Sequence, residues 1–232
     1  MKRRTFVLLA GAALAGCAAP PPPRAAGPAP SPSTGSPAMP APALLSAARA
    51  ADVAGVRRAL AAGEPVDTRG EGGRTALFGA VVADHIEVAR VLVAAGADPD
   101  ALDDRHDSPF LETGVSGSVA MLRVLLPAGP DLTLENRFGG LAVIPACERG
   151  HVEYVREIVK TGINLDHVNR PGWTALLECV VLGDGGPRYQ EITRILIGAG
   201  ADPGIGDRNG VTALQHAGRR GYGEIARILR AA

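Results

Sequence analysis

The chain has 232 residues, carries no formal net charge, and is 46% hydrophobic but only 3% aromatic. Alanine, valine and leucine must therefore supply most of the core, which favours closely packed helices over a β-sandwich built from aromatic and β-branched side chains. Residues 1–42 hold four of the 24 basic side chains and none of the 24 acidic ones, so the remainder has a net charge of about −4 and no excess of positive charge with which to bind nucleic acid.

The N-terminus, residues 1–16, is predicted to be an export signal. Three basic side chains precede an apolar run, Phe6 to Gly16, that is too short to cross a bilayer as a helix. The sequence "LAGC" at its end resembles the lipobox of bacterial lipoproteins, in which the signal is cut before a cysteine that is then lipidated. The resemblance implies a lipid anchor on Cys17, and the alternative is an ordinary signal peptide with a chance cysteine. "RRTF" also resembles part of a twin-arginine signal, so the choice between Sec and Tat export stays open.

Residues 17–42 are predicted to form a disordered linker rich in proline and alanine. Ten prolines and a single charge stand in residues 18–42, so the segment cannot bury a core, and at about 3.1 Å per residue in polyproline II geometry it could extend roughly 75 Å. The competing interpretation is a proline-rich ligand for another domain. With Cys17, the linker indicates a domain tied to a bacterial envelope membrane, inner or outer, by its lipid anchor alone and facing the periplasm or the cell surface.

From Leu44 onward the sequence repeats itself. Between successive repeat positions lie two stretches with apolar residues at helical spacing, such as Leu77 and Val81 and then Ile86 and Leu92. Glycines suited to ending the second stretch stand at 63, 96, 129, 162 and 200, in steps of 33, 33, 33 and 38. The same four steps separate a second series, Thr75, Ser108, Leu141, Thr174 and Thr212. The agreement of two independent series indicates a repeat architecture.

Segments such as "GGRTALFGAV" with "DHIEVARVLVAAGADPD", and "PGWTALLECV" with "EITRILIGAGADP", resemble the ankyrin repeat, a hairpin turn followed by two antiparallel helices. The resemblance implies an all-α solenoid of helix pairs with β-hairpin turns over residues 43–232, as an N-terminal cap and five repeats near 71–102, 103–134, 135–168, 169–206 and 207–232. It also implies that a threonine at the position of Thr75 caps the first helix of its repeat. The family's Thr-Pro-Leu-His tetrapeptide is intact in none of the five repeats, and its histidine, which ties neighbouring repeats together, is missing from all of them.

The middle of the stack is expected to be its weakest part. Pro127 removes a backbone donor near the end of the second repeat, Leu141 stands where a capping residue should be, and Pro145 is expected inside the following helix. In a solenoid each repeat contributes its own stability and that of its neighbour contacts, so we expect repeats two and three to open first in hydrogen exchange.

The sequence gives little support to catalysis, and we expect neither catalytic residues nor a cofactor. His85 and His151 occupy the same repeat position, which indicates a structural role. The alternative is a metal-dependent or enzymatic envelope factor built on "DDRHD", Asp103 to Asp107, although a solvated turn is the favoured interpretation because adjacent turn residues point apart. Cys147 and Cys179 are expected to be small buried thiols, with a disulfide as the alternative that the sequence leaves open.

Noncatalytic protein binding is the function that the resemblance implies, through the hairpin tips and the exposed faces of the first helices. Arg137, Arg170 and Arg208 stand at equivalent tip positions, and Phe138 and Trp173 lie on the same tips. Arginine and aromatic side chains dominate interface energetics, so these five residues are the predicted contacts of an unidentified protein partner. A purely structural spacer without a partner is a further alternative. We expect a monomer that binds no nucleic acid.

The step of 38 reflects five additional residues, 183–187, in "GDGGP". They are predicted to lie in the turn between the two helices of the fourth repeat, far from the hairpin tips. Lengthening a surface turn costs little entropy, so a neutral insertion is favoured. The alternative is a second contact site formed by Asp184, Arg188 and Tyr189.

Overall fold

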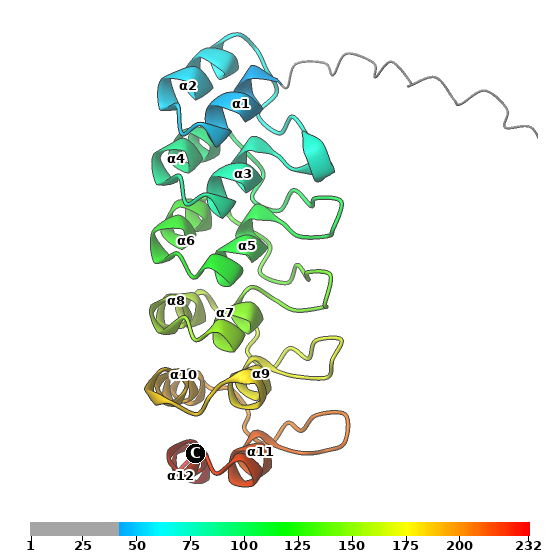
Figure 1. Ribbon diagram of the computed structural model, residues 1–232, viewed down its shortest axis with the longest axis vertical. Helices are drawn as coiled ribbons and strands as arrows, with labels where there is room; N and C mark the ends of the chain where they lie inside the picture. The colour runs from blue at the N-terminus through cyan, green and yellow to red at the C-terminus, as the bar shows by residue number, and fades with distance from the viewer. Residues whose placement is uncertain (1–41) are drawn as a thin grey trace, which may run out of the picture. The chain divides into compact units, whose positions relative to one another are not determined.

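The computed structural model describes residues 42–232, which form six stacked pairs of helices (Figure 1). The predicted signal peptide, Cys17 and all of the linker before residue 42 lie outside the described residues. The first helices of the pairs are α1 Ala43–Arg49, α3 Ala76–Val82, α5 Pro109–Ser116, α7 Val143–Arg149, α9 Ala175–Leu182 and α11 Ala213–Arg220. The second helices are α2 Val53–Ala61, α4 Ile86–Ala94, α6 Val119–Leu125, α8 Val152–Ile158, α10 Pro187–Gly198 and α12 Gly223–Arg230. Short 3-10 helices are η1 Glu71–Gly73, η2 Leu126–Ala128 and η3 Val159–Thr161.

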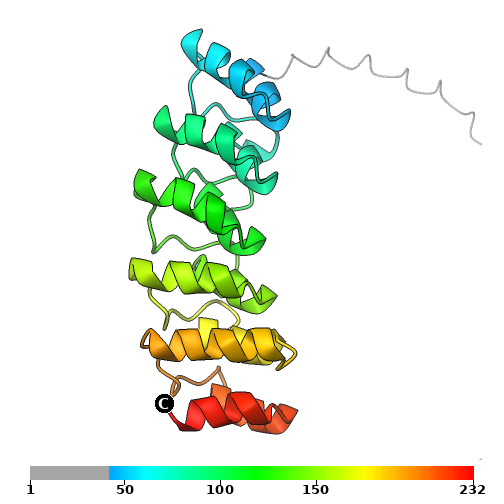
Figure 2. The ribbon, with the colours of Figure 1, turned by 90° about the vertical axis from the view of Figure 1, so that its left-hand side faces the viewer.

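The two rows of helices and the row of hairpins confirm the predicted all-α solenoid. First helices lie above one another, second helices form a parallel row beside them, and the hairpins project from the side of the first helices (Figure 1). Turned by 90°, the pairs appear as successive layers (Figure 2). Backbone hydrogen bonds close the hairpins, as from the N–H of Asn136 to the carbonyl of Gly140 at 3.0 Å and from the N–H of Gly139 to the carbonyl of Asn136 at 2.8 Å. None of the helices within residues 42–232 has both the length and the hydropathy needed to cross a membrane.

Side-chain oxygens cap most of the first helices, as the resemblance to the ankyrin repeat implies. Thr75, Ser108, Thr174 and Thr212 each accept a hydrogen bond from the backbone N–H three residues later. Each cap satisfies a backbone donor that the helix cannot pair internally. Leu141, at the equivalent position before α7, is instead buried in the core.

At four of the five steps of the stack, a side chain at the start of the second helix joins its repeat to the one before it; at the start of α6, Ser118 caps its own helix instead. Each of the four joining side chains reaches a backbone carbonyl at or just beyond the end of the preceding first helix, which has no partner within that helix. The pairs are His85 Nδ1 with Ala48 O at 3.1 Å, His151 Nε2 with Val115 O at 3.1 Å, Tyr189 Oη with Glu148 O at 2.9 Å, and Tyr222 Oη with Gly183 O at 3.0 Å. The structural role expected for His85 and His151 is confirmed.

The expectation that Pro145 interrupts a helix interior is wrong. α7 begins at Val143, so Pro145 is its third residue. The backbone N–H groups of the first turn have no acceptor within the helix, and a proline there removes no helical hydrogen bond. Pro127 lies in η2, after α6 has ended. Early opening of repeats two and three stays a prediction.

Repeats two and three are joined by a buried hydroxyl pair. Tyr154 of α8 and Thr113 of α5 are both fully buried, and their hydroxyl oxygens lie 2.7 Å apart. Thr113 also lies 2.6 Å from the carbonyl of Phe110, to which its hydroxyl donates. The Tyr154 hydroxyl is therefore the donor between the two side chains, and its burial raises its pKa.

Replacing Tyr154 by phenylalanine should lower the free energy of unfolding by about 1 kcal/mol, because Thr113 loses a donor in a fully buried site. Urea denaturation measures this. The same change in a Thr113→Val background should cost clearly less, since the partner is already absent. Equal costs in the two backgrounds would show that the hydroxyl pair contributes nothing.

Candidate binding groove

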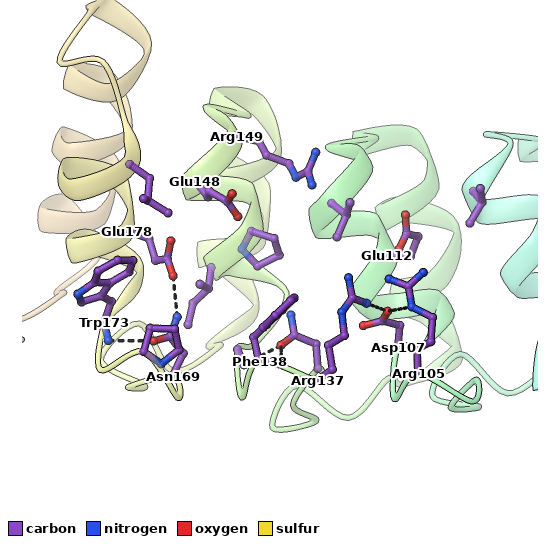
Figure 3. Close-up of a pocket in the computed structure, with 18 of the residues that line it drawn as sticks. Arg105, Asp107, Glu112, Arg137, Phe138, Glu148, Arg149, Asn169, Trp173 and Glu178 are labelled. Atoms are coloured by element: carbon purple, nitrogen blue, oxygen red, sulfur yellow. Dashed lines mark hydrogen bonds and ion pairs between the residues drawn. The ribbon is translucent and has the colours of Figure 1, made fainter. Parts of the chain in front are cut away.

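A hollow of about 440 Å³ runs along the row of first helices from α3 to α9, beside the hairpins (Figure 3). We call it the central groove. Its charged lining residues are Arg74, Arg105, Asp107, Glu112, Arg137, Glu148, Arg149 and Glu178. Its apolar lining residues are Phe78, Val82, Val115, Phe138, Ile144, Pro145, Pro171, Trp173 and Leu182. It therefore combines apolar surface with charges of both signs.

Exposed apolar side chains gather in this groove. Within residues 42–232, four large hydrophobic side chains are about half exposed, and Val82, Phe138 and Leu182 among them line the groove. Phe138 is the most exposed, at 55%. Trp173 is half-buried and packs against the core beside them. A concentration of exposed apolar surface marks a place where another molecule docks.

The hairpin tips that border the groove are rigid because an Asp or Asn side chain organises each turn. In the fourth repeat, Asn169 Oδ1 accepts hydrogen bonds from the N–H groups of Gly172 and Trp173, at 3.1 and 2.9 Å. Asn136 does the same for Phe138 and Gly140 in the third repeat. Asp103 and Asp207 hold the equivalent position in the second and fifth repeats. Such side-chain bonds to backbone N–H groups fix a turn, and here they fix the aromatic residues that it carries.

One end of the groove is basic, but its arginines are paired. Arg137 forms an ion pair with Asp107 and places its guanidinium 4.7 Å from the ring centre of Phe138. Arg74 pairs with Asp103 at 3.2 Å. Arg105 lies 4.0 Å from Asp107 (Figure 3). In the segment Asp103 to Asp107, the alternative metal site of the sequence analysis, the carboxylates of Asp103 and Asp107 are thus engaged with arginines.

The histidine of that segment has a structural explanation. His106 adopts a φ of 60°, at the tip position where the third, fourth and fifth repeats place Gly139, Gly172 and Gly210. Within residues 42–232, no three His, Cys, Asp or Glu side chains are grouped so as to hold a metal ion.

The other end of the groove is acidic and centred on Glu178 of α9. Glu178 is only 5% exposed, and its Oε1 accepts a hydrogen bond from Asn169 Nδ2 at 2.6 Å (Figure 3). Its Oε2 is buried and has no hydrogen-bond partner among the described residues. Burial and, to a smaller extent, the negative charge of Glu148 raise the pKa of Glu178 to about 7 against the effect of the Asn169 bond. A buried carboxyl group with one unpaired oxygen and a raised pKa is unusual for a purely structural residue.

Of the eight residues predicted to contact a partner, three line the central groove: Arg137, Phe138 and Trp173. Arg170 and Arg208 lie outside it, at the hairpin tips. Arg170 Nη1 donates to the carbonyl of Arg137 at 2.8 Å, and the Arg208 guanidinium donates to the carbonyl of Arg170. Each of the two arginines therefore connects its own hairpin to the preceding one.

The remaining three residues lie at or after the inserted turn, between α9 and α10. Tyr189 is 7% exposed and bonded to Glu148, so its side chain belongs to the stack. Asp184 and Arg188 are exposed, and Asp184 Oδ1 accepts the N–H of Gly186 within the turn. Gly183 is buried against Tyr189 and accepts the Tyr222 hydroxyl, so the insertion is packed at its first residue.

Cys147 and Cys179 are free and buried. Cys179 lies 3.4 Å from the carbonyl of Tyr189, and burial raises its pKa to about 12. Both side chains fill core space as thiols, the arrangement that the sequence favoured.

Glu178, Glu148 and Asn169 were not predicted as site residues. A periodic signal for two of them exists in the sequence. Asn169 stands five residues before Thr174 and Glu178 four after it, and Asp207 and His216 hold the same positions around Thr212, where their side chains lie 2.8 Å apart. In both repeats a side chain of the hairpin tip thus bonds to a side chain of the first helix. An acidic residue at the helix position of this pair is therefore a sequence signal for a carboxylate in the wall of the groove.

Glu178→Gln should make the protein more stable above neutral pH. The folded state keeps the Glu178 proton up to a pKa of about 7, whereas the unfolded chain loses it near its usual pKa of 4.5, so stability falls as the pH rises through this window. Glutamine abolishes this loss. We expect the Tm of the variant to exceed that of the wild type by about 3 °C at pH 8 and to match it at pH 5. Glu153→Gln, on the exposed face of α8, is the control and should change neither value. Equal Tm values for wild type and Glu178→Gln at pH 8 would contradict the assignment.

The comparisons with known proteins agree with this architecture. The family descriptions "Ankyrin repeats (3 copies)" and "Ankyrin repeat" match residues 113–207 and 72–104. YahD of Escherichia coli (strain K12), whose name describes it as an ankyrin repeat protein, is 40% identical over 195 residues, which are 84% of this chain and 96% of YahD. The ankyrin repeat domain ABAYE2397 of Acinetobacter baumannii AYE is 46% identical, with a TM-score of 0.79 over 81% of this chain and 96% of its own.

The ankyrin repeat protein EF0377 is 39% identical, with a TM-score of 0.78 over the same shares of the two chains. Ankyrin repeats are in general noncatalytic scaffolds for protein–protein interaction. The sequence period, the stacked helix pairs and these relatives lead to one conclusion. The chain belongs to the ankyrin-repeat family.

Proposed function

We propose that this chain is a lipid-anchored protein of the bacterial envelope whose repeats bind an extended segment of a partner protein in the central groove. The observation that carries the proposal is the gathering of Val82, Phe138 and Leu182, each about half exposed, in one hollow with Trp173. Anchoring through Cys17 is supported by the "LAGC" sequence and the proline-rich linker, both of which precede the described residues.

The shape of the groove favours a segment of chain over a small molecule. Its lining residues come from α3, α5, α7 and α9 and from the hairpins between them. With neighbouring helices about 10 Å apart, four of them span roughly 30 Å, the length of about nine extended residues. An aromatic ring on each of two rigid tips, Phe138 and Trp173, offers anchoring contacts that lose little side-chain entropy on binding.

Partner binding can be measured with a photo-crosslinking amino acid in place of Leu182, at the groove wall. In illuminated cells we expect a covalent adduct with an envelope protein. Phe138→Ala should lower the adduct yield on the order of tenfold, because an exposed aromatic anchor is lost, and leave the Tm within about 2 °C.

Val168→Ala is the matched control, since Val168 is also about half exposed but lies outside the groove. It should leave the adduct yield unchanged. An adduct that forms equally well in both variants would contradict the role of Phe138 as an anchor, and the absence of any adduct would favour the structural spacer.

The anchor is tested separately by Cys17→Ser in cells supplied with a labelled fatty acid. Lipidation requires the Cys17 thiol, so the variant should lose the label and leave the membrane fraction. Cys147→Ser, which removes a buried thiol of the core, should keep both. A labelled Cys17→Ser protein would refute the anchor.

A further inference from the structure

The acidic end of the central groove contains charge that nothing in the described residues neutralises. Neither Glu178 nor Glu148 forms an ion pair within residues 42–232. Glu178 adds a buried oxygen, Oε2, without a hydrogen-bond partner. A buried acceptor left unpaired costs free energy, and a ligand that supplies a donor recovers it.

The arginines that line the groove do not serve these two carboxylates. Arg74, Arg105 and Arg137 lie toward α3 and α5 and are engaged with Asp103 and Asp107. Arg149 stands on the α5 side of Glu148 (Figure 3), and its charge acts on Glu112, whose pKa burial raises and Arg149 lowers. A positive charge at the Glu178 end must therefore come from another molecule.

The surroundings of Glu178 fit a flat cation. Trp173 lies beside it in the groove wall (Figure 3), and among the described residues no arginine or lysine stacks on its ring, whereas Phe138 is already covered by Arg137. A guanidinium can stack on an aromatic face and donate several hydrogen bonds in its plane, so it can bond to more than one carboxylate at once. A lysine ammonium is a point charge with a tightly held water shell and is less suited to such a site.

We propose that the Glu178 end of the central groove binds an arginine side chain of the partner's extended segment, stacked on Trp173 and hydrogen-bonded to Glu178 and Glu148. The inference rests on the proposed function, because it assigns the chemistry of the segment that the groove would hold. It predicts that the partner's segment carries an arginine that is essential for binding.

Trp173 is the only tryptophan of the chain, so its fluorescence reports this site directly. The purified full chain at pH 8 would be titrated with a blocked pentapeptide, Ala-Ala-Arg-Ala-Ala, and with the same peptide carrying citrulline or lysine in place of arginine. Citrulline keeps the shape and loses the charge. We expect a saturable fluorescence change with the arginine peptide, and at least tenfold weaker binding of the citrulline and lysine peptides.

Glu178→Gln should weaken binding of the arginine peptide at least tenfold. It retains an acceptor for Asn169, and its Tm verifies that it is folded. Glu153→Gln, outside the groove, should bind as the wild type does. No saturable change, equal binding of the citrulline or lysine peptide, or an unaffected Glu178→Gln variant would overturn the proposal.

The two hypotheses fail separately. If the Leu182 adduct forms and depends on Phe138 while the arginine peptide does not bind, the proposed function stands and the arginine site falls. If the peptide binds through Glu178 and no adduct forms in cells, the site exists and the proposed function falls.

Discussion

The structure depends on the inability of a single helix pair to bury its own apolar surface. Each first helix is short, seven or eight residues, and isolated helices of that length are unstable in water. Their stability comes from the faces that they share with the repeats above and below. Hydrogen bonds between repeats add to these shared faces. His151 and Tyr189 each bond to a backbone carbonyl at the end of the preceding first helix.

The groove follows from the same constraint. Because the first helices lie in register, the residue at one position of each helix comes to lie on a common wall, and the hairpins add a second wall. Asn136 and Asn169 fix the hairpins from within, while Arg170 bonds one hairpin to the next. Phe138 and Trp173 are therefore held in place before any partner arrives, which reduces the entropy lost on binding.

The sequence predicted the architecture well because the architecture is periodic. Helix pairs, caps and the structural histidines all depend on local spacing that recurs, so each was visible several times. The site was predicted only in part. Residue type and tip position found Phe138 and Trp173 but also selected Arg170, whose guanidinium is used between hairpins. Tyr189 was considered as a surface contact in the alternative interpretation of the insertion, although it occupies the repeat position of His85 and His151; in the structure its hydroxyl donates to a carbonyl 41 residues away.

Glu178 was missed for a related physical reason. A glutamate in the first turn of a helix is ordinarily a solvated residue that favours the helix dipole, and its burial arises only when α7, α9 and the Asn169 hairpin assemble around it.

The five-residue insertion shows how a solenoid accommodates extra chain without losing its register. Gly183 stays buried and still offers its carbonyl to Tyr222, so the bond between repeats four and five keeps the form found at three other steps of the stack. The added residues are taken up partly by the turn and partly by α10, which has 12 residues and begins at Pro187, a residue suited to the first position of a helix. Leu182, the last groove residue of α9, immediately precedes the insertion. The extra chain thus begins at the edge of the groove, after the wall formed by α9 has ended, so repeat four can vary at this turn without altering the residues of α9 that line the groove.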